Sequence, residues 1–183
     1  MTKRIRRVIV GLDAAQQSRG LLEAAAELAG EMQAELLGLF VENEDLLHFA
    51  GLPFAREVGF ESATRRPLDV MSMERTLRGL AKEARQLLES VAGPTRIRWS
   101  FRVVRGAPAT QLLAAAEESD LVIANLEAPP QAACAVSFRV IRAGDVEALR
   151  AALEETEGGA LVLSGADLMQ LGQTLRTAAG RQP

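Results

Sequence analysis

The chain has 183 residues, of which 48% are apolar and 25% charged, and its formal net charge is −3. This length suits one well-buried domain, so we expect a single domain over residues 1–183. The charge gives no general attraction to nucleic acid or to an anionic membrane, and no stretch reaches the roughly 18 apolar residues of a membrane span. A single cysteine, Cys134, excludes an internal disulfide framework, and these features together favour a cytoplasmic protein.

Strand and helix patterns alternate along most of the chain, which predicts an α/β fold with a doubly wound, mostly parallel sheet and helices on both faces. The first strand is expected at about 8–12, and residues 35–42 form a second continuous apolar run of strand length. Between them, apolar residues recur at helical spacing: Leu21, Ala25, Leu28 and Met32. We expect this helix to pack on that face only, with its glutamates turned away: Glu23, Glu27 and Glu31.

The connection over residues 43–67 has no clear periodicity and is longer than usual connections. It contains several large apolar residues: Leu46, Leu47, Phe49, Leu52, Phe54 and Phe60. Leaving such side chains in water is costly, at roughly 1.5–3 kcal/mol each. We therefore predict a flap over the strand ends, partly buried against the sheet or a second subunit; the alternative is disorder.

Next, a long amphipathic helix is predicted over about 69–92, where Gly93 and Pro94 stop it. Residues 97–103 then alternate between apolar and polar, which favours an edge or half-exposed strand with Ile97, Trp99, Phe101 and Val103 on one face. A helix is expected from Pro108 to about Glu118. The wholly apolar run that follows, at about 120–125, is typical of a central strand.

The C-terminal third contains an internal repeat. Residues 101–118 align without gaps on residues 138–155, with about half of the positions identical, and an apolar strand follows each copy. Coincidence between two amphipathic helices is the alternative to a repeated strand–helix–strand unit. We predict a strand–helix–strand–helix extension over 136–180. Because 136–142 alternates and 160–164 does not, the sheet should have six strands in the order 97–103, 35–42, 8–12, 120–125, 160–164, 136–142.

Two segments of the chain resemble the universal stress protein family. Residues 7–41, RVIVGLDAAQQSRGLLEAAAELAGEMQAELLGLFV, are similar to its opening strand, Asp-Gly-Ser turn, Ala-rich helix and second strand, although Ala14 and Ala15 replace the Gly-Ser of that turn. The later segment VVRGAPATQLLAAAEESDLVIAN is similar to the Gly-x-Pro helix and Ala-Asp-Leu strand of the family. The matching positions there are Gly106, Pro108, Asp120 and Leu121. The resemblance covers about 7–125 and omits 43–67.

This resemblance implies a Rossmann-like fold of the adenine-nucleotide alpha hydrolase type. Its five strands take the order third, second, first, fourth and fifth along the chain, and dimers are frequent. In members that bind ATP, the nucleotide lies over the ends of the first and fourth strands. Carried over to this chain, the crevice residues are Asp13, Val41, Gly106 and Asn125. Capping of the following helix or turn is the alternative role for Asp13, and a buried valine and a turn glycine need no ligand to explain them.

The chain departs from the family where phosphate would bind. Members that bind nucleotides follow the fourth strand with Gly-x-x-Gly and later Gly-Ser or Gly-Thr, whereas this chain reads ANLEAPPQAACAV. Glycines let backbone N–H groups point at phosphates, but Pro129 and Pro130 have no N–H, and Glu127 adds negative charge. We therefore expect no tightly bound ATP and no other cofactor.

No motif in the sequence indicates catalysis or a metal site. His48 is the only histidine and has no nucleophile placed near it by a motif, and the acidic residues Glu42, Glu44 and Asp45 lack the glycine of a calcium loop. We favour a non-catalytic regulatory or interaction protein, a homodimer with a possible protein partner. The alternative is a nucleotide-binding or small-ligand-binding stress-response protein that uses the crevice; a nucleotide-hydrolysing enzyme comes third.

Overall fold

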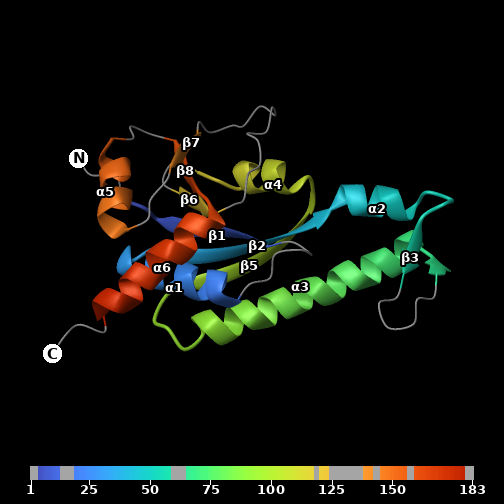
Figure 1. The fold of residues 1–183 in the computed structure, drawn as a ribbon, viewed down its shortest axis with the longest axis horizontal. Helices are drawn as coiled ribbons and strands as arrows, with labels where there is room; N and C mark the ends of the chain where they lie inside the picture. Colours follow the sequence, from blue (N-terminus) through green and yellow to red (C-terminus); the bar gives the residue numbers. More distant parts are fainter. Residues whose placement is uncertain are drawn as a thin grey trace.

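A computed structural model describes residues 4–12, 19–58, 65–117, 120–123, 138–141, 145–155 and 159–179. The strands in these residues are β1 (Arg7–Leu12), β2 (Glu35–Asn43), β3 (Arg56–Val58), β4 (Arg65–Pro67), β5 (Trp99–Gly106), β6 (Asp120–Ile123), β7 (Phe138–Ile141) and β8 (Ala160–Leu163). The helices are α1 (Arg19–Glu31), α2 (Glu44–Ala50), α3 (Val70–Ala92), α4 (Pro108–Ala114), α5 (Val146–Glu154) and α6 (Gly165–Ala179). Figure 1 shows the helices arranged around a twisted sheet.

The main sheet has six parallel strands in the order β5-β2-β1-β6-β8-β7, and β3 and β4 form a separate antiparallel pair. This is the strand order predicted from the sequence. All four residues of β8 are buried between β6 and β7, whereas Val140 of the edge strand β7 is 59% exposed. The continuous apolar run and the alternating run thus take the inner and outer positions that their patterns favour.

The two faces of the sheet are covered by different helices. The larger core cluster joins α1, α3, α5 and α6 to one face, and the smaller cluster joins α4 to the other. The chain moves across the sheet in one direction from β1 to β2, from β2 to β5 and from β7 to β8, and in the opposite direction from β5 to β6. Right-handed connections between parallel strands then require α4 to lie opposite α1, α3 and α5.

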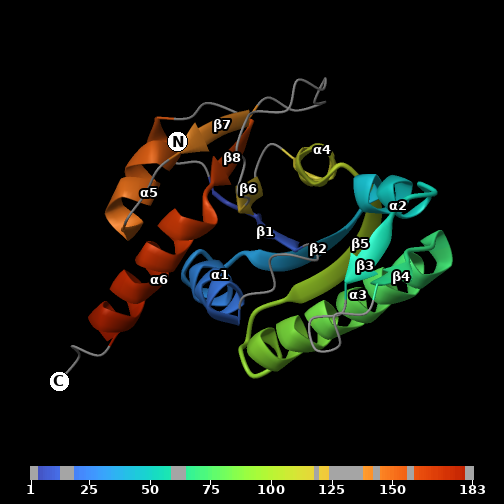
Figure 2. The same cartoon turned by 45° about the vertical axis from the view of Figure 1, so that its right-hand side comes forward.

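Helix α1 is enclosed more completely than its sequence pattern indicates. It packs on the sheet between α3 and α6 (Figure 2), so the prediction of a single packed face is wrong. Its buried residues include a second, alanine-rich stripe: Leu21, Leu22, Ala24, Ala25, Ala26, Leu28 and Ala29. The small side chains let α6 approach closely: a Cβ added at Gly172 would lie 2.7 Å from the Cβ of Ala24, a separation that real Cβ atoms do not show.

The connection over 43–67 has regular structure that was not predicted. Asn43 caps α2 by accepting a hydrogen bond from the backbone N–H of Asp45 at 3.0 Å, and α2 packs beside α3 and β5. Leu47 is buried, but Phe49 and Phe54 are 48% and 71% exposed. Within the single chain, Phe49, Leu52 and Phe54 are therefore not buried against the sheet, and burial against a second subunit stays a prediction; Phe60 lies outside the described residues.

Two helix and strand patterns differ in detail from the prediction. Helix α4 ends at Ala114 rather than near Glu118, because the next residues form the turn that leads into β6, where the N–H of Asp120 donates to the carbonyl of Glu117 at 3.0 Å. β5 lies at the edge of the sheet, as its alternating pattern predicts, but Val103 is 44% exposed. Val104, on the other face, packs against the smaller core cluster.

A buried ion pair joins the starts of β1 and β6. Nη2 of Arg7 lies 2.5 Å from Oδ2 of Asp120, whose residue is only 2% exposed, and Nη2 also donates to the carbonyl of Ala115 at 3.1 Å. Oδ2 of Asp120 also accepts hydrogen bonds from Nε of Arg7 at 3.2 Å and from the N–H of Glu117 at 2.9 Å. Burial lowers the pKa of Arg7, but the hydrogen bond and charge of Asp120 outweigh it and raise that pKa overall.

Removal of the Asp120 carboxylate should destabilise the fold strongly. The Asp120→Ala variant leaves Arg7 partly buried without its counter-ion, so we expect the free energy of unfolding to fall by about 3 kcal/mol. Urea denaturation followed by circular dichroism measures this loss. The Arg7→Ala, Asp120→Ala double variant should be clearly less destabilised than the sum of the two single variants. Strict additivity would show that the two side chains are not energetically coupled.

Candidate functional site

The crevice predicted from the family resemblance lies at the carboxyl ends of the strands, and the structure describes half of its predicted residues. Val41 is on β2 and Gly106 ends β5, and the two strands pair so that Val41 faces Val104 and Asn43 faces Gly106. The fold therefore brings Val41 and Gly106 to the same end of neighbouring strands. Asp13, Asn125 and the stretch that replaces the phosphate-binding glycines lie outside the described residues.

The Val41 side chain is part of the hydrophobic core. It is 1% exposed and belongs to the smaller cluster with Ile9, Leu39 and Leu112, on the face of the sheet that α4 covers. A side chain buried in this way is held by packing and presents no polar group. Its position is fully accounted for without a ligand.

Gly106 has a conformational reason to be glycine. Its φ angle is +146°, which residues with a side chain rarely adopt, and a Cβ added there would lie 2.5 Å from Nε2 of Gln111. The residue thus turns the chain from β5 into α4, which begins at Pro108. This is the turn role that the sequence analysis left open beside the ligand role.

The polar side chains near this end of β2 and β5 pair with each other. Nε and Nη2 of Arg105 donate to Oε2 of Glu42 at 3.1 and 3.0 Å, and Nη2 also contacts Oε1 of Glu74 at 3.4 Å. The hydrogen bond to Glu42 is the main reason that the pKa of Arg105 is raised. His48 is exposed on α2. Within the described ranges, no group of three or more His, Cys, Asp or Glu side chains is placed to hold a metal ion.

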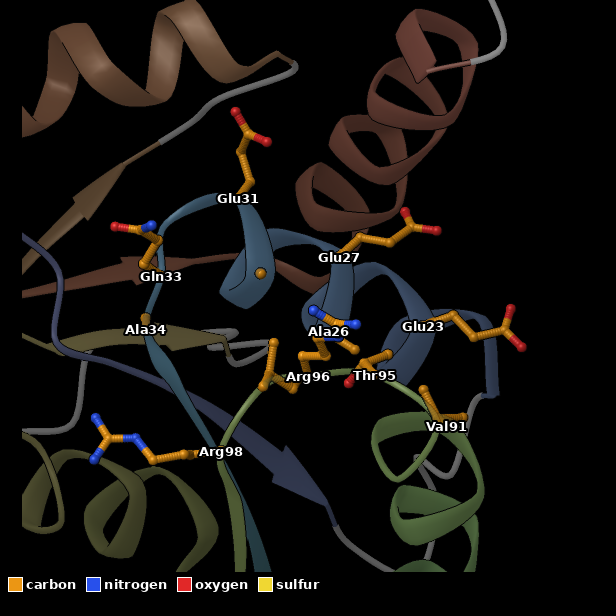
Figure 3. A pocket seen from close by; sticks show the side chains of 12 residues that line it. Glu23, Ala26, Glu27, Glu31, Gln33, Ala34, Val91, Thr95, Arg96 and Arg98 are labelled. Carbon is orange, nitrogen blue, oxygen red and sulfur yellow. The ribbon is translucent and has the colours of Figure 1, made fainter.

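A pocket of about 670 Å³ lies at the opposite end of the strands, where the sequence predicts no site. One side is α1 and the turn after it, and the other is the segment from the end of α3 to the start of β5 (Figure 3). We call its apolar lining the pocket floor: Ala26, Ala34, Val91 and Ile97. Its charged residues are Glu23, Glu27, Glu31, Arg96 and Arg98. In the sequence, the helix end near Gln33 lacks the glycine that often follows such an end, but this feature does not predict a pocket.

Comparison with known proteins gives matches in structure but not in sequence. No family model matches the chain, and no curated protein matches it. One similar solved structure is a universal stress protein in complex with cAMP, with 15% identity and a TM-score of 0.39 over 66% of this chain and 72% of that one. Another is the universal stress protein UspA from Lactobacillus plantarum, with 16% identity and a TM-score of 0.42 over 87% of this chain and 97% of that one. At these identities and TM-scores, the matches assign no function to this chain.

The helices provide one further observation. Of those in the described part of the chain, none is long and apolar enough to cross a bilayer.

Replacement of Gly106 should test whether its backbone is constrained. We expect Gly106→Ala to lower the free energy of unfolding by about 1–3 kcal/mol, because an L residue is strained at this φ and its Cβ displaces Gln111. Chemical denaturation measures the change. Gly79→Ala is the matched control: a Cβ there meets nothing within 4 Å in the middle of α3, so it should stabilise the protein by up to about 1 kcal/mol. Equal effects of both substitutions would contradict a special role for Gly106.

Proposed function

We propose that this chain is a non-catalytic, cytoplasmic interaction protein, a divergent relative of the universal stress proteins, and that it works as a homodimer. The observation that carries the proposal is an apolar surface at one end of the molecule. We define this end surface by five residues: Phe49, Leu52, Phe54, Val70 and Met71. The order β5-β2-β1-β6 agrees with the order that the family resemblance implies for its first four strands, and this supports the kinship.

The residues of the end surface come from two segments that lie side by side. Figures 1 and 2 place α2, the strands after it and the first turns of α3 together at one end of the molecule. A Cβ added at Gly51 would lie 3.6 Å from Cγ2 of Val70, and the N–H of Leu68 donates to the carbonyl of Ala55 at 3.1 Å. The turn after α2 is thus fixed against the segment that leads into α3.

The exposure of these side chains is unusual for a surface without a partner. Phe54 and Met71 are 71% and 66% exposed, and Phe49, Leu52 and Val70 are 39–48% exposed. The end surface holds five of the seven large apolar residues that are exposed in the described part of the chain. Clustered apolar exposure of this kind marks protein interaction sites more often than solvent-facing surface.

The charges around the end surface favour a second copy as its partner. Glu44 and Asp45 begin α2, and the basic side chains of Arg56 and Arg75 lie on the segments beside it; all four residues are exposed. Acidic and basic groups therefore border the same apolar centre. Two identical surfaces related by a two-fold axis can then pair apolar residues in the middle and opposite charges at the edge.

Weak or absent ATP binding is the second part of the proposal. The stretch ANLEAPPQAACAV lacks the glycines of a phosphate-binding loop, and of the crevice residues that the structure describes, Val41 is core and Gly106 is a turn. Loss of three charge-assisted hydrogen bonds to phosphate corresponds to at least about 4 kcal/mol, or roughly a thousandfold in affinity. The alternative function is a nucleotide or small-ligand binder that uses the crevice.

Charges placed in the end surface should break the dimer. We expect the Phe54→Glu, Met71→Glu double variant to be monomeric at concentrations where the parent protein dimerises, because two buried carboxylates per copy oppose association. Sedimentation equilibrium measures the dissociation constant. Both residues are exposed in the single chain, so the variant should keep the circular dichroism spectrum of the parent.

The matched control is Val140→Glu, which places the same charge on another exposed apolar residue, at the β7 edge of the sheet. It should leave the dimer intact. A dimer disrupted by Val140→Glu and not by the double variant would place the interface at the β7 edge and overturn the proposed surface. A parent protein that stays monomeric would overturn the homodimer itself.

Addition of ATP with magnesium should not stabilise the protein. A working site at about a hundred times its dissociation constant would add roughly 2.7 kcal/mol, which corresponds to a rise of about 5–10 °C in melting temperature at this chain length. Differential scanning fluorimetry with and without ATP and magnesium measures the shift, and AMP serves as a control for the nucleoside alone. A rise of that size, abolished by Asp13→Ala, would establish the crevice as a nucleotide site and favour the alternative function.

A further inference from the structure

We infer that the pocket beside α1 binds a small organic anion, with its acidic group held by Arg96 and an apolar body against the pocket floor. A carboxylate or a phosphate monoester on an aryl or alkyl body has this chemistry. The inference is independent of the end surface and of the crevice. It rests on the way in which the charges that line this pocket are paired.

Each glutamate of the pocket already has an arginine partner from outside it. Glu27 accepts from Nη1 of Arg176 on α6 at 3.1 Å through both carboxylate oxygens, and Oε1 of Glu31 lies 3.6 Å from Nη2 of Arg150 on α5. These contacts turn the carboxylates toward the C-terminal helices. In Figure 3 the side chain of Glu31 points away from the segment that carries Arg96.

The third glutamate is paired within its own helix. Oε1 of Glu23 accepts from Nε of Arg19 at 3.0 Å. All three negative charges of the pocket wall are therefore balanced by arginines that do not line the pocket. An incoming cation would have to compete with these arginines for the carboxylates.

The two arginines of the pocket have no such balance. Neither Arg96 nor Arg98 forms an ion pair with any carboxylate in the described part of the chain, and both are exposed. In Figure 3 Arg96 lies next to Ala26 of α1, whereas the side chain of Arg98, just before β5, extends away from Arg96. The uncompensated charge of the pocket is positive, and guanidinium groups bind carboxylate and phosphate oxygens through pairs of hydrogen bonds.

The floor of the pocket determines the rest of the ligand. Of its residues, Ala34 and Val91 are buried, and Ile97 is partly buried. An inorganic ion would leave this apolar surface in contact with water. A ligand with an aryl or short alkyl body covers it, which is the usual composition of a small-molecule site.

Gln33 supplies a second, independent observation at the same place. It is the only non-glycine residue with positive φ among those that the structure describes, at +53°, and it lines the pocket. It ends α1 with the N–H of Ala34 donating to the carbonyl of Ala29 at 2.8 Å, an arrangement in which glycine is the unstrained residue. The chain keeps a strained residue that adds an exposed amide to the rim, and such strain clusters at functional sites.

The test is titration of ¹⁵N-labelled protein with phenyl phosphate and with benzoate, followed by two-dimensional NMR. We expect both compounds to shift the backbone resonances of Gly30, Gln33 and Arg96. Benzamide, which has no charge, and inorganic phosphate, which has no apolar body, should each bind at least about tenfold more weakly. The comparison of phenyl phosphate with benzoate separates a phosphate site from a carboxylate site.

Three substitutions then decide between recognition and non-specific attraction. Arg96→Ala should weaken phenyl phosphate binding by about tenfold or more, whereas Arg98→Ala should weaken it less, because the Arg98 side chain extends away from Arg96. Arg102→Ala is the matched control, because Arg102 is an exposed arginine of β5 that does not line the pocket, and it should leave the affinity unchanged. Gln33→Gly should raise the melting temperature while weakening binding, the pattern of a strained site residue.

The inference is overturned if neither aryl anion shifts pocket resonances at millimolar concentration, or if benzamide binds as tightly as benzoate. It is also overturned if Arg102→Ala weakens binding as much as Arg96→Ala, since a general positive field would then explain the attraction. Unchanged folding of each arginine variant is checked by its NMR spectrum before titration. Because the altered arginines are exposed in the structure, loss of the fold is not expected.

Discussion

The direction in which each connection crosses the sheet determines the face of the sheet on which its helix lies. Parallel strands must be joined by connections of one hand, so a helix lies on one face when the chain crosses in one direction and on the other face when it crosses back. Three described connections run one way and one runs the other. As a consequence, α1 has α3 on one side and α6 on the other, whereas α4 is the described helix that packs on the opposite face.

This asymmetry separates three regions that have different chemistry. The amino ends of the strands hold the Arg7–Asp120 pair and, beside α1, the pocket with unpaired arginines. The carboxyl ends of β2 and β5 hold the Glu42–Arg105 pair, a core valine and a turn glycine. The end surface projects beyond the sheet on α2 and the start of α3. The proposed ligand site and the proposed dimer surface thus share no residues.

The repeat in the sequence shows how context alters a local unit. Both copies fold as strand, helix and strand, as their patterns predict, but β7 and β8 are neighbours, whereas β2 and β1 lie between β5 and β6. The two helices consequently pack on opposite faces of the sheet. Nothing in the shared Phe-Arg-Val-x-Arg segment encodes that difference, which arises from the position at which each unit joins the sheet.

Much of the fold could be predicted from the sequence because inner and edge strands have different patterns of apolar residues. Ala160–Leu163 is apolar throughout and lies inside, and the alternating segment around Val140 lies at the edge. The surroundings of 43–67 could not be predicted, because large apolar residues indicate burial whether their partner is the same chain or another. The tight approach of α6 to Ala24 also left no periodic signal, since alanine suits a solvent-facing helix as well as a packed one.

The candidate sites could also be predicted only in part from the sequence. Val41 and Gly106 could be placed on neighbouring strand ends from the family resemblance, but their local roles needed the burial and the φ angle. The pocket was not predictable, because the important feature is which arginine each glutamate meets. Arg150 and Arg176 lie far along the chain from their partners on α1, and pairings of that range are set by the tertiary fold alone.

The contact between α1 and α6 also bears on the order in which the protein is completed during synthesis. Glu27 and Arg176 are 149 residues apart, and Gly172 closes on Ala24 over a similar span. Strands β5, β2, β1 and β6 can assemble as soon as they leave the ribosome, yet one side of α1 stays uncovered until the last helix emerges. A chain that has reached β6 but not yet α6 therefore exposes the alanine-rich side of α1, which α6 covers once it has folded.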